Sequence, residues 1–216
     1  MGYLSDYKVK WRSYESIGAI ALKMRKKFGL SNIGVFNIVH LFRRLEGLQF
    51  GRSGSLNIKL YKDLPKKAYV THKPLTLHVD IEIWNEAEEG EPLARFILAH
   101  ELGHILLHED YEYRYSSDEA SRLKFVQNEE SSEWQADSFG EQFLVPNALS
   151  TRCKTVLDIT TNFDIPELYA QNRLEKLVER RKMFDGEVCS KCQNCTLLRN
   201  GSSLKCDTCG GATPCF

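Results

Sequence analysis

The chain has 216 residues and a formal net charge of zero, with 42% hydrophobic and 27% charged residues. This length suits one ordinary domain with a small appendage, and the composition is typical of a soluble globular protein. A zero net charge gives no electrostatic argument for a nucleic-acid or membrane partner. The chain lacks an apolar run near the ~18 residues of a transmembrane helix, and residues 1–10 lack the apolar segment of a signal peptide. We therefore expect a cytoplasmic protein.

Two helices are predicted in the N-terminal part of the chain. Apolar residues recur at helical spacing over 12–28, and Gly29 follows this stretch, as glycine often does at a helix end. A second helix is predicted over 35–45, with Ser31 and Asn32 as its cap. The basic side chains of the first helix are expected on its solvated face.

The pattern then changes to an alternation of apolar and polar residues. This alternation predicts strands over 56–60 and 75–83, each with one buried face. The acidic stretch 85–92 is expected to be a turn. A helix is predicted over 93–107, because this stretch holds one glycine and no proline and its apolar residues recur at helical spacing.

Further helices are predicted over 129–144 and 165–183, the second with a proline in its first turn. The polar and aromatic stretch 111–128 is expected to be a loop or a broken helix. An Asp-Gly pair marks a boundary after the last helix. We therefore expect one domain over 1–185 and a small one over 186–216.

The predicted helix over 93–107 contains His100-Glu101-Leu102-Gly103-His104, an H-E-x-x-H motif. Histidines four residues apart lie on one helix face, about one turn from each other, so both rings can reach one Zn²⁺. Glu101 is then placed to take a proton from water activated by the metal, as the general base of a metallopeptidase does.

A catalytic zinc usually has three protein ligands and one open position. The metzincin pattern would require a third histidine six residues beyond His104, but that residue is Asp110. His108 lies one turn beyond His104, too far along a straight helix to share the metal. We expect His108 to be a structural or substrate-side residue.

The third ligand is expected to be a carboxylate from the helix over 129–144. Glu129, Glu130 and Glu133 are candidates, and Glu133 is favoured because Asp137 follows it on the same helix face. One of these two carboxylates could bind the metal. The other could accept a hydrogen bond from a ligand histidine and so fix its tautomer.

Two blocks of sequence resemble the ImmA/IrrE family of metallopeptidases. The first block is 94–108, which contains the H-E-x-x-H motif, and the second is 133–146, which begins Glu-Trp-Gln-Ala-Asp. Both blocks occur in the family's order, and the resemblance covers roughly 10–183. Gly140 stands where alanine is more usual in the family.

The resemblance implies an α+β fold of helices packed around a small mixed sheet, as in zincins. It implies zinc bound by His100, His104 and Glu133, with Glu101 as the catalytic base. Family members are often found with mobile elements, toxin–antitoxin pairs or stress responses, and their typical substrates are helix-turn-helix repressors. We therefore expect a zinc-dependent endopeptidase that cleaves a regulatory protein, such as a helix-turn-helix repressor or an antitoxin.

Six of the seven cysteines lie in the last part of the chain, which many relatives lack. In a chain without a secretion signal, such clustering favours metal binding over disulfides. Two C-x-x-C pairs flank a predicted hairpin, which is the layout of a zinc ribbon. This ribbon is expected to hold a second, structural zinc through Cys189, Cys192, Cys206 and Cys209.

The sequence leaves some assignments in the tail open. Cys192 with Cys195 is an alternative first pair, and Cys215 is expected to be spare. Because about 30 residues cannot build an adequate core, bound metal would supply the folding energy. The seventh cysteine, Cys153, stands alone and is expected to be a buried thiol.

A second hypothesis is a zinc-binding regulatory or interaction module with little or no proteolytic activity. In this case the tail would recruit a partner. The presence of Glu101 argues against this hypothesis, because zinc binding alone does not require it. The tail has few basic residues (Lys191, Arg199 and Lys205), which favours protein recognition over nucleic-acid binding.

Overall fold

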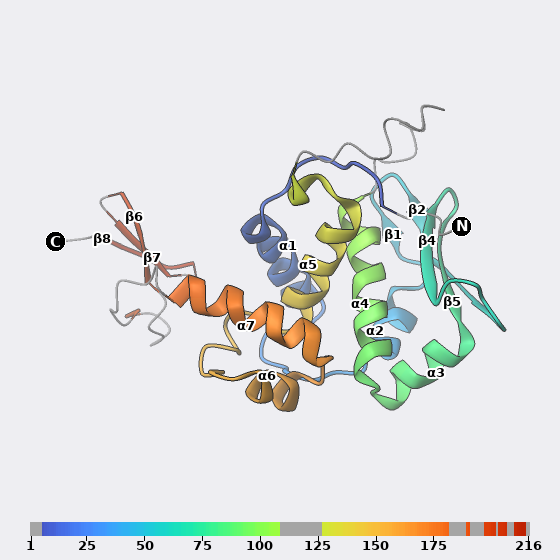
Figure 1. Ribbon diagram of the computed structural model, residues 1–216. Coiled ribbons are helices and arrows are strands. Elements are labelled where there is room, and N and C mark those ends of the chain that lie inside the picture. Colours follow the sequence, from blue (N-terminus) through green and yellow to red (C-terminus); the bar gives the residue numbers. More distant parts are fainter. Residues whose placement is uncertain are drawn as a thin grey trace.

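The computed structural model describes residues 6–108, 127–181, 189–190, 197–201, 203–206 and 210–214. Figure 1 shows the helices and strands in these ranges. The helices are α1 (Tyr14–Lys27), α2 (Ile38–Leu45), α3 (Ile81–Glu89), α4 (Pro92–Leu107), α5 (Ser132–Leu144), α6 (Val156–Phe163) and α7 (Glu167–Arg181). The strands are β1 (Gln49–Phe50), β2 (Gly54–Ser55), β3 (Asn57–Tyr61), β4 (Ala68–His72), β5 (Leu75–Asp80), β6 (Leu197–Asn200), β7 (Ser203–Cys206) and β8 (Ala212–Pro214).

The main sheet has three strands in the order β3-β5-β4. Strand β5 pairs in parallel with β3 and antiparallel with β4, so the sheet is mixed. The centre of the sheet lies on β5, where Leu75, Leu77 and Val79 are fully buried. The prediction of helices around a small mixed sheet is confirmed, although β4 was not predicted from the sequence.

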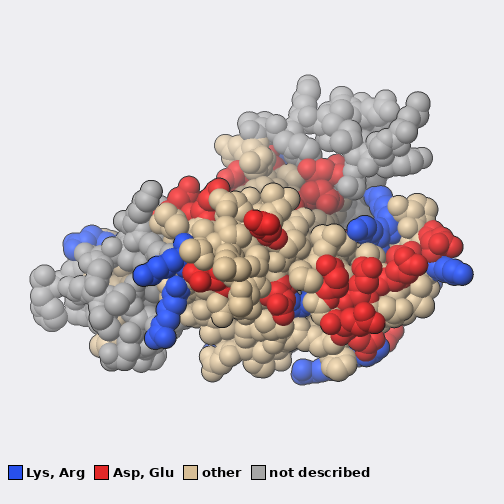
Figure 2. All heavy atoms as spheres, turned by 60° about the horizontal axis from the view of Figure 1, so that its bottom comes forward, with Lys and Arg blue, Asp and Glu red and all other residues tan. Residues whose placement is uncertain are grey.

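The strand predicted over 75–83 is too long. It ends at Asp80, whose side chain accepts a hydrogen bond from the backbone N–H of Glu82 and so caps α3. The stretch expected to be an acidic turn is therefore mostly helical. The apolar residues Ile83 and Trp84 of α3 pack into the core, and acidic side chains gather on the exposed face of this helix (Figure 2).

The first two helices form close to the predicted ranges. Ser13 caps α1 through its side chain. The second helix begins three residues later than predicted, and its cap is Asn37, whose side chain accepts from the N–H of His40. The predicted cap at Ser31 and Asn32 is wrong, because these residues lie in a turn before the helix.

Helix α4 lies between α5 and the sheet and is the central element of the fold (Figure 1). Its core-facing residues Leu98, Ala99, Leu102 and Ile105 are fully buried. Gly103 allows α5 to come close: a Cβ at this position would lie 3.0 Å from the Cα of Ala136. The helices predicted over 93–107 and 129–144 are confirmed, with a 3-10 turn at 128–130 before α5.

The C-terminal part of the domain holds a helix pair. Helix α7 was predicted, whereas α6 was not predicted as a separate element. A capping box fixes the start of α6: the Thr155 hydroxyl accepts from the N–H of Asp158, whose carboxylate accepts from the N–H of Thr155. Both helices pack against the same core as α4.

The described part of the tail forms an antiparallel sheet in the order β6-β7-β8. The predicted hairpin is confirmed, with Asn200 opposite Ser203 and a turn at Gly201. Cys189, Cys206 and two leucines form a small buried cluster that is distinct from the main core. The division of the chain at residue 185 stays a prediction, and the loop predicted over 111–128 falls almost entirely outside the described residues.

No described helix has both the length and the apolar character needed to cross a bilayer.

Candidate metal centre

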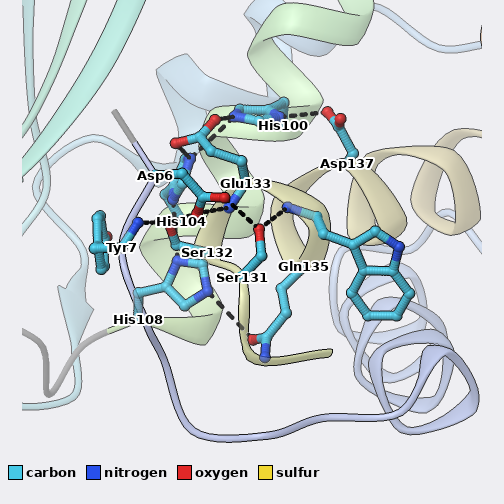
Figure 3. A network of polar contacts seen from close by, with 11 residues as sticks. Asp6, Tyr7, His100, His104, His108, Ser131, Ser132, Glu133, Gln135 and Asp137 are labelled. Atoms are coloured by element: carbon cyan, nitrogen blue, oxygen red, sulfur yellow. Dashed lines mark hydrogen bonds and ion pairs between the residues drawn. The ribbon is translucent and has the colours of Figure 1, made fainter. Parts of the chain in front are cut away.

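Helix α4 and the first turn of α5 bring three potential ligands together (Figure 3). The Nε2 atoms of His100 and His104 lie 2.9 Å apart. The carboxylate of Glu133 lies 3.2 Å from His100 Nε2 through Oε2 and 3.6 Å from His104 Nε2 through Oε1. Among the described residues, these three side chains alone form a cluster able to hold a metal ion.

These separations fit a tetrahedral zinc ion. Zinc bonds to histidine nitrogen and carboxylate oxygen measure about 2.0–2.2 Å, so ligand atoms at tetrahedral corners lie roughly 3.3 Å apart. The three observed separations lie on both sides of this value. Two histidines and one carboxylate also match the donor set of catalytic zinc sites that keep an open position.

The orientation of His100 is fixed from the side opposite the cluster. Its Nδ1 lies 2.7 Å from Oδ1 of Asp137, one turn along α5 from Glu133. A carboxylate can only accept here, so Nδ1 carries the hydrogen. The Nε2 of His100 is the atom that faces Glu133. The sequence-based expectation that one carboxylate faces the metal site and the other orients a histidine agrees with this arrangement.

The centre favours a positive charge. Burial by itself lowers the pKa of His100, but the hydrogen bonds to Asp137 and Glu133 outweigh it and raise the pKa to about 10. Burial by itself raises the pKa of Glu133, but the neighbouring His100 and His104 hold the pKa well below its usual range. The position between these side chains therefore suits a cation.

Glu101 lies on the same helix between the two histidines. Its side chain is buried, and its Oε2 makes no hydrogen bond within the described part of the chain. Burial raises the pKa of Glu101, and the neighbouring His104 and His100 oppose this shift. An unpartnered carboxylate oxygen in a buried place is costly, and a water or substrate group in the site would satisfy it.

The N-terminal segment anchors the first turn of α5, which carries Glu133. Asp6 accepts hydrogen bonds from the Ser131 hydroxyl at 2.7 Å and from the Ser132 hydroxyl at 2.9 Å. It also accepts from the backbone N–H of Glu133 at 3.2 Å. This role of Asp6 could not be predicted from the sequence, because more than 120 residues separate the partners and a lone aspartate carries no motif.

His108 lies behind the centre. Its Nδ1 is 3.0 Å from Nδ1 of His104, and its Nε2 is 3.3 Å from Oε1 of Gln135. Burial, with a further contribution from His104, lowers the pKa of His108 well below its usual value. This placement agrees with a structural role, and it removes His108 as a donor toward substrate because both ring nitrogens face protein atoms.

The other predicted residues fall outside this cluster or outside the described ranges. Glu129 and Glu130 lie in the 3-10 turn before α5, and Glu130 pairs with Lys8 at 3.0 Å. Cys189 and Cys206 are buried in the tail. The other predicted ribbon ligands, Cys192 and Cys209, lie outside the described residues, as do the alternative ligand Cys195 and the spare Cys215. Cys153 is buried, as predicted.

Comparison with protein families identifies the class of this chain. Residues 66–174, half of its length, match the peptidase family described as the IrrE N-terminal-like domain. The matched range contains the H-E-x-x-H motif, Glu133 and Asp137. The chain belongs to this family, in agreement with the resemblance found in the sequence.

Two curated relatives share a short stretch with the chain. The vitamin B12-dependent ribonucleotide reductase of Bradyrhizobium diazoefficiens is 49% identical over 51 residues, which cover 21% of this chain and 4% of that protein. The enzyme of the same name from Agrobacterium fabrum is 53% identical over 32 residues, which cover 15% of this chain and 2% of that protein. The chain spans only a few per cent of these relatives. No solved structure gives a significant match.

Proposed function

We propose that this protein is a zinc-dependent endopeptidase, with His100, His104 and Glu133 as zinc ligands and Glu101 as the general base. One observation carries the proposal. The ligand atoms of three side chains converge beside a buried carboxylate whose Oε2 lacks a partner in the described structure. Membership of a peptidase family supports this interpretation.

The residues of the site have separate tasks in peptide hydrolysis. Bound zinc would polarise the scissile carbonyl and lower the pKa of a water molecule. Glu101 would accept the proton of that water at Oε2 and pass it to the leaving amine. Asp137 would keep His100 in the tautomer that presents Nε2. The burial of Glu101 keeps bulk water from competing for its proton.

An extended protein segment is the proposed form of the substrate. Strand β4 contacts α4 and occupies one edge of the three-stranded sheet in the described structure. Extended peptides commonly bind by adding a strand to such an edge. A helix-turn-helix repressor or an antitoxin, which the family resemblance implies, would have to unfold locally to bind in this way.

The test compares Glu101→Gln with the unmodified enzyme on an unfolded protein and on candidate repressors. We expect cleavage to fall by about 10²–10⁴-fold, as for the loss of a general base, with unchanged zinc content. Glu86→Gln is the matched control, because Glu86 lies exposed on α3. Undiminished cleavage by the Glu101 variant would refute the mechanism.

The alternative is a zinc-binding regulatory module with little proteolytic activity. The buried carboxylate of Glu101 weighs against it, since zinc binding needs no such group and its burial is costly. The same assays separate the two proposals. A protein that binds zinc at His100 and His104 and cleaves neither unfolded proteins nor repressors would favour the module.

We also propose a structural zinc in the tail, bound by Cys189, Cys192, Cys206 and Cys209. The buried cluster of Cys189 and Cys206 beside the β6-β7 hairpin supports this site. In the full chain, replacing Cys189 and Cys206 together by serine should remove one zinc per chain, because a closed thiolate site loses its geometry with two ligands. Equal zinc content before and after the replacement would rule the ribbon out.

A further inference from the structure

A histidine that binds catalytic zinc must direct a nitrogen lone pair at the metal. The hydrogen-bond partner of the other ring nitrogen determines which nitrogen carries that lone pair. In His104 the atom that faces Glu133 is Nε2. If Nε2 is to bind a metal, the hydrogen must sit on Nδ1, and Nδ1 needs an acceptor. The atom in reach is Nδ1 of His108, at 3.0 Å. The distance between these two Nδ1 atoms does not show which of them donates the hydrogen bond.

Gln135 removes this ambiguity. Its Nε2 lies 2.8 Å from the backbone oxygen of Lys10 and 2.6 Å from that of Glu129. Both oxygens only accept, so the amide nitrogen must be the atom that faces them. The orientation of the amide is thereby fixed. Its oxygen Oε1 points to Nε2 of His108, at 3.3 Å.

The hydrogen positions then follow one from the next. Oε1 of Gln135 accepts, so Nε2 of His108 carries the hydrogen. His108 is 1% exposed, which favours the neutral ring, so its Nδ1 holds a lone pair and accepts. His104 must therefore donate from Nδ1. The lone pair of His104 is left on Nε2, on the side of Glu133.

We propose that His108 and Gln135 are positioning residues that fix His104 in the tautomer required of a metal ligand. The proposal rests on the proposed function, because it assumes that Nε2 of His104 binds zinc. The backbone oxygens of Lys10 and Glu129 are the outer end of the chain of hydrogen bonds. The ring of Tyr7 packs edge-on to His108, with centroids 6.1 Å apart, and holds its plane.

The two histidines of the centre are thus oriented by different means. His100 has a carboxylate, Asp137, whose side chain is 42% exposed and keeps part of its hydration. His104 lies deeper, beside the buried Glu101. A second carboxylate there would add a buried negative charge next to Glu101. A neutral imidazole and a neutral amide orient the ring without that cost.

The test uses the full-length protein and measures its dissociation constant for Zn²⁺ by competition with a chelator. His108→Leu removes the acceptor, and we expect about 10–100-fold weaker binding, as for the loss of other groups that orient metal ligands. His108→Asn should recover most of the affinity, because its side-chain oxygen can take the place of Nδ1. Unchanged affinity in His108→Leu would overturn the proposal, as would equal losses in the Leu and Asn variants.

Gln135→Met is the second variant, and Gln142→Met is its matched control. Both glutamines are buried on α5 and donate to backbone oxygens, but only Gln135 reaches His108. We expect weaker zinc binding in the first variant only. Equal affinities in the two variants would contradict the relay.

Nitrogen-15 spectra of the histidine rings in zinc-free protein give a readout that does not depend on metal or activity. We expect the hydrogen of His104 on Nδ1 and that of His108 on Nε2, and mixed tautomers of His104 in His108→Leu. The opposite tautomers in the unmodified protein would refute the relay. Correct tautomers in a protein that binds no zinc at His104 would leave the relay standing and refute the proposed function instead.

Discussion

The close approach of α4 and α5 at Gly103 makes a sharp prediction about the metal centre. Gly103 precedes the ligand His104, and α5 carries the third ligand. A Cβ at position 103 would lie 3.0 Å from Cα and 3.1 Å from the backbone oxygen of Ala136, and 3.2 Å from Cβ of Phe139. Two of these three atoms belong to the backbone, so no side-chain rotation can make room. Gly103→Ala must therefore push the helices apart.

The size of the effect follows from these distances. The closest contact must open by roughly 0.5 Å to reach the ~3.5 Å of an ordinary carbon–carbon contact. Overpacking of this kind costs about 1–3 kcal/mol, against a gain of about 1 kcal/mol from replacing glycine by alanine within a helix. We expect a net loss of about 1 kcal/mol in the free energy of unfolding. A movement of 0.5 Å exceeds the ±0.2 Å tolerance of zinc–ligand distances, so zinc should bind at least about tenfold more weakly.

Gly140→Ala is the matched control. A Cβ there would lie 3.4 Å from a ring carbon of Phe96 and 3.5 Å from the backbone nitrogen of His100, which are near-ordinary contacts. We expect this variant to gain up to about 1 kcal/mol and to bind zinc normally. Urea unfolding and zinc competition on both variants provide the measurement. If Gly103→Ala matches Gly140→Ala in stability and in zinc affinity, the argument from close helix packing is wrong.

Two further predictions concern the carboxylates of α5. Glu133→Ala should remove most zinc from the centre, whereas Asp137→Ala should weaken zinc binding by about 10–100-fold; a larger loss in the Asp137 variant, measured by metal analysis and chelator competition, would contradict the assigned roles. Burial raises the pKa of Glu141 from 4.5 to about 7, so the folded state binds the carboxyl proton of Glu141 more tightly than the unfolded chain does. The stability that this proton contributes is present below about pH 4.5 and is lost as the pH rises to about 7. Glu141→Gln should therefore stabilise the protein by up to about 3 kcal/mol at pH 8 and by much less at pH 5; equal effects in urea unfolding at both pH values would contradict the raised pKa.

The sequence predicts those parts of the centre that depend on local spacing. His100 and His104 are four residues apart on one helix, and so are Glu133 and Asp137, so each pair shares a helix face whatever the rest of the fold does. The choice of Glu133 over Glu129 and Glu130 rested on this spacing and on the family resemblance. The cluster around Glu133 agrees with that choice.

The supporting contacts could not be predicted in the same way. Asp6 and the backbone oxygen of Lys10 reach the start of α5 across more than 120 residues of sequence. A single aspartate and a carbonyl group leave no periodic pattern. Gln135 reads as an ordinary polar helix residue, and only its three hydrogen-bond partners give it a specific role.

The wrong element boundaries have a similar cause. Apolar residues at 79, 81 and 83 continue the alternation of β5, so a period of two extends the strand past its end. The side chain of Asp80 competes with that pattern by capping the helix that begins at Ile81. The same residue accepts from the N–H of Leu64, so it also fixes the loop after β3. The capping hydrogen bond therefore outweighs the short apolar alternation, because it satisfies a backbone N–H group at the start of α3 that would otherwise lack a partner.

The first turn of α5 links the metal centre to the N-terminal segment. The N–H groups at this helix end and the helix dipole favour negative charge. The carboxylates of Asp6 and Glu133 both lie at this end of the helix. Asp6 binds the N–H of Glu133 and the hydroxyls of two serines, while the side chain of Glu133 is directed toward the histidines. Ser131 caps the helix by accepting from the N–H of Trp134, and Asp6 satisfies the N–H of Glu133. The carboxylate of Glu133 remains available to a cation, because Ser131 and the distant Asp6 satisfy the N–H groups at the start of the helix.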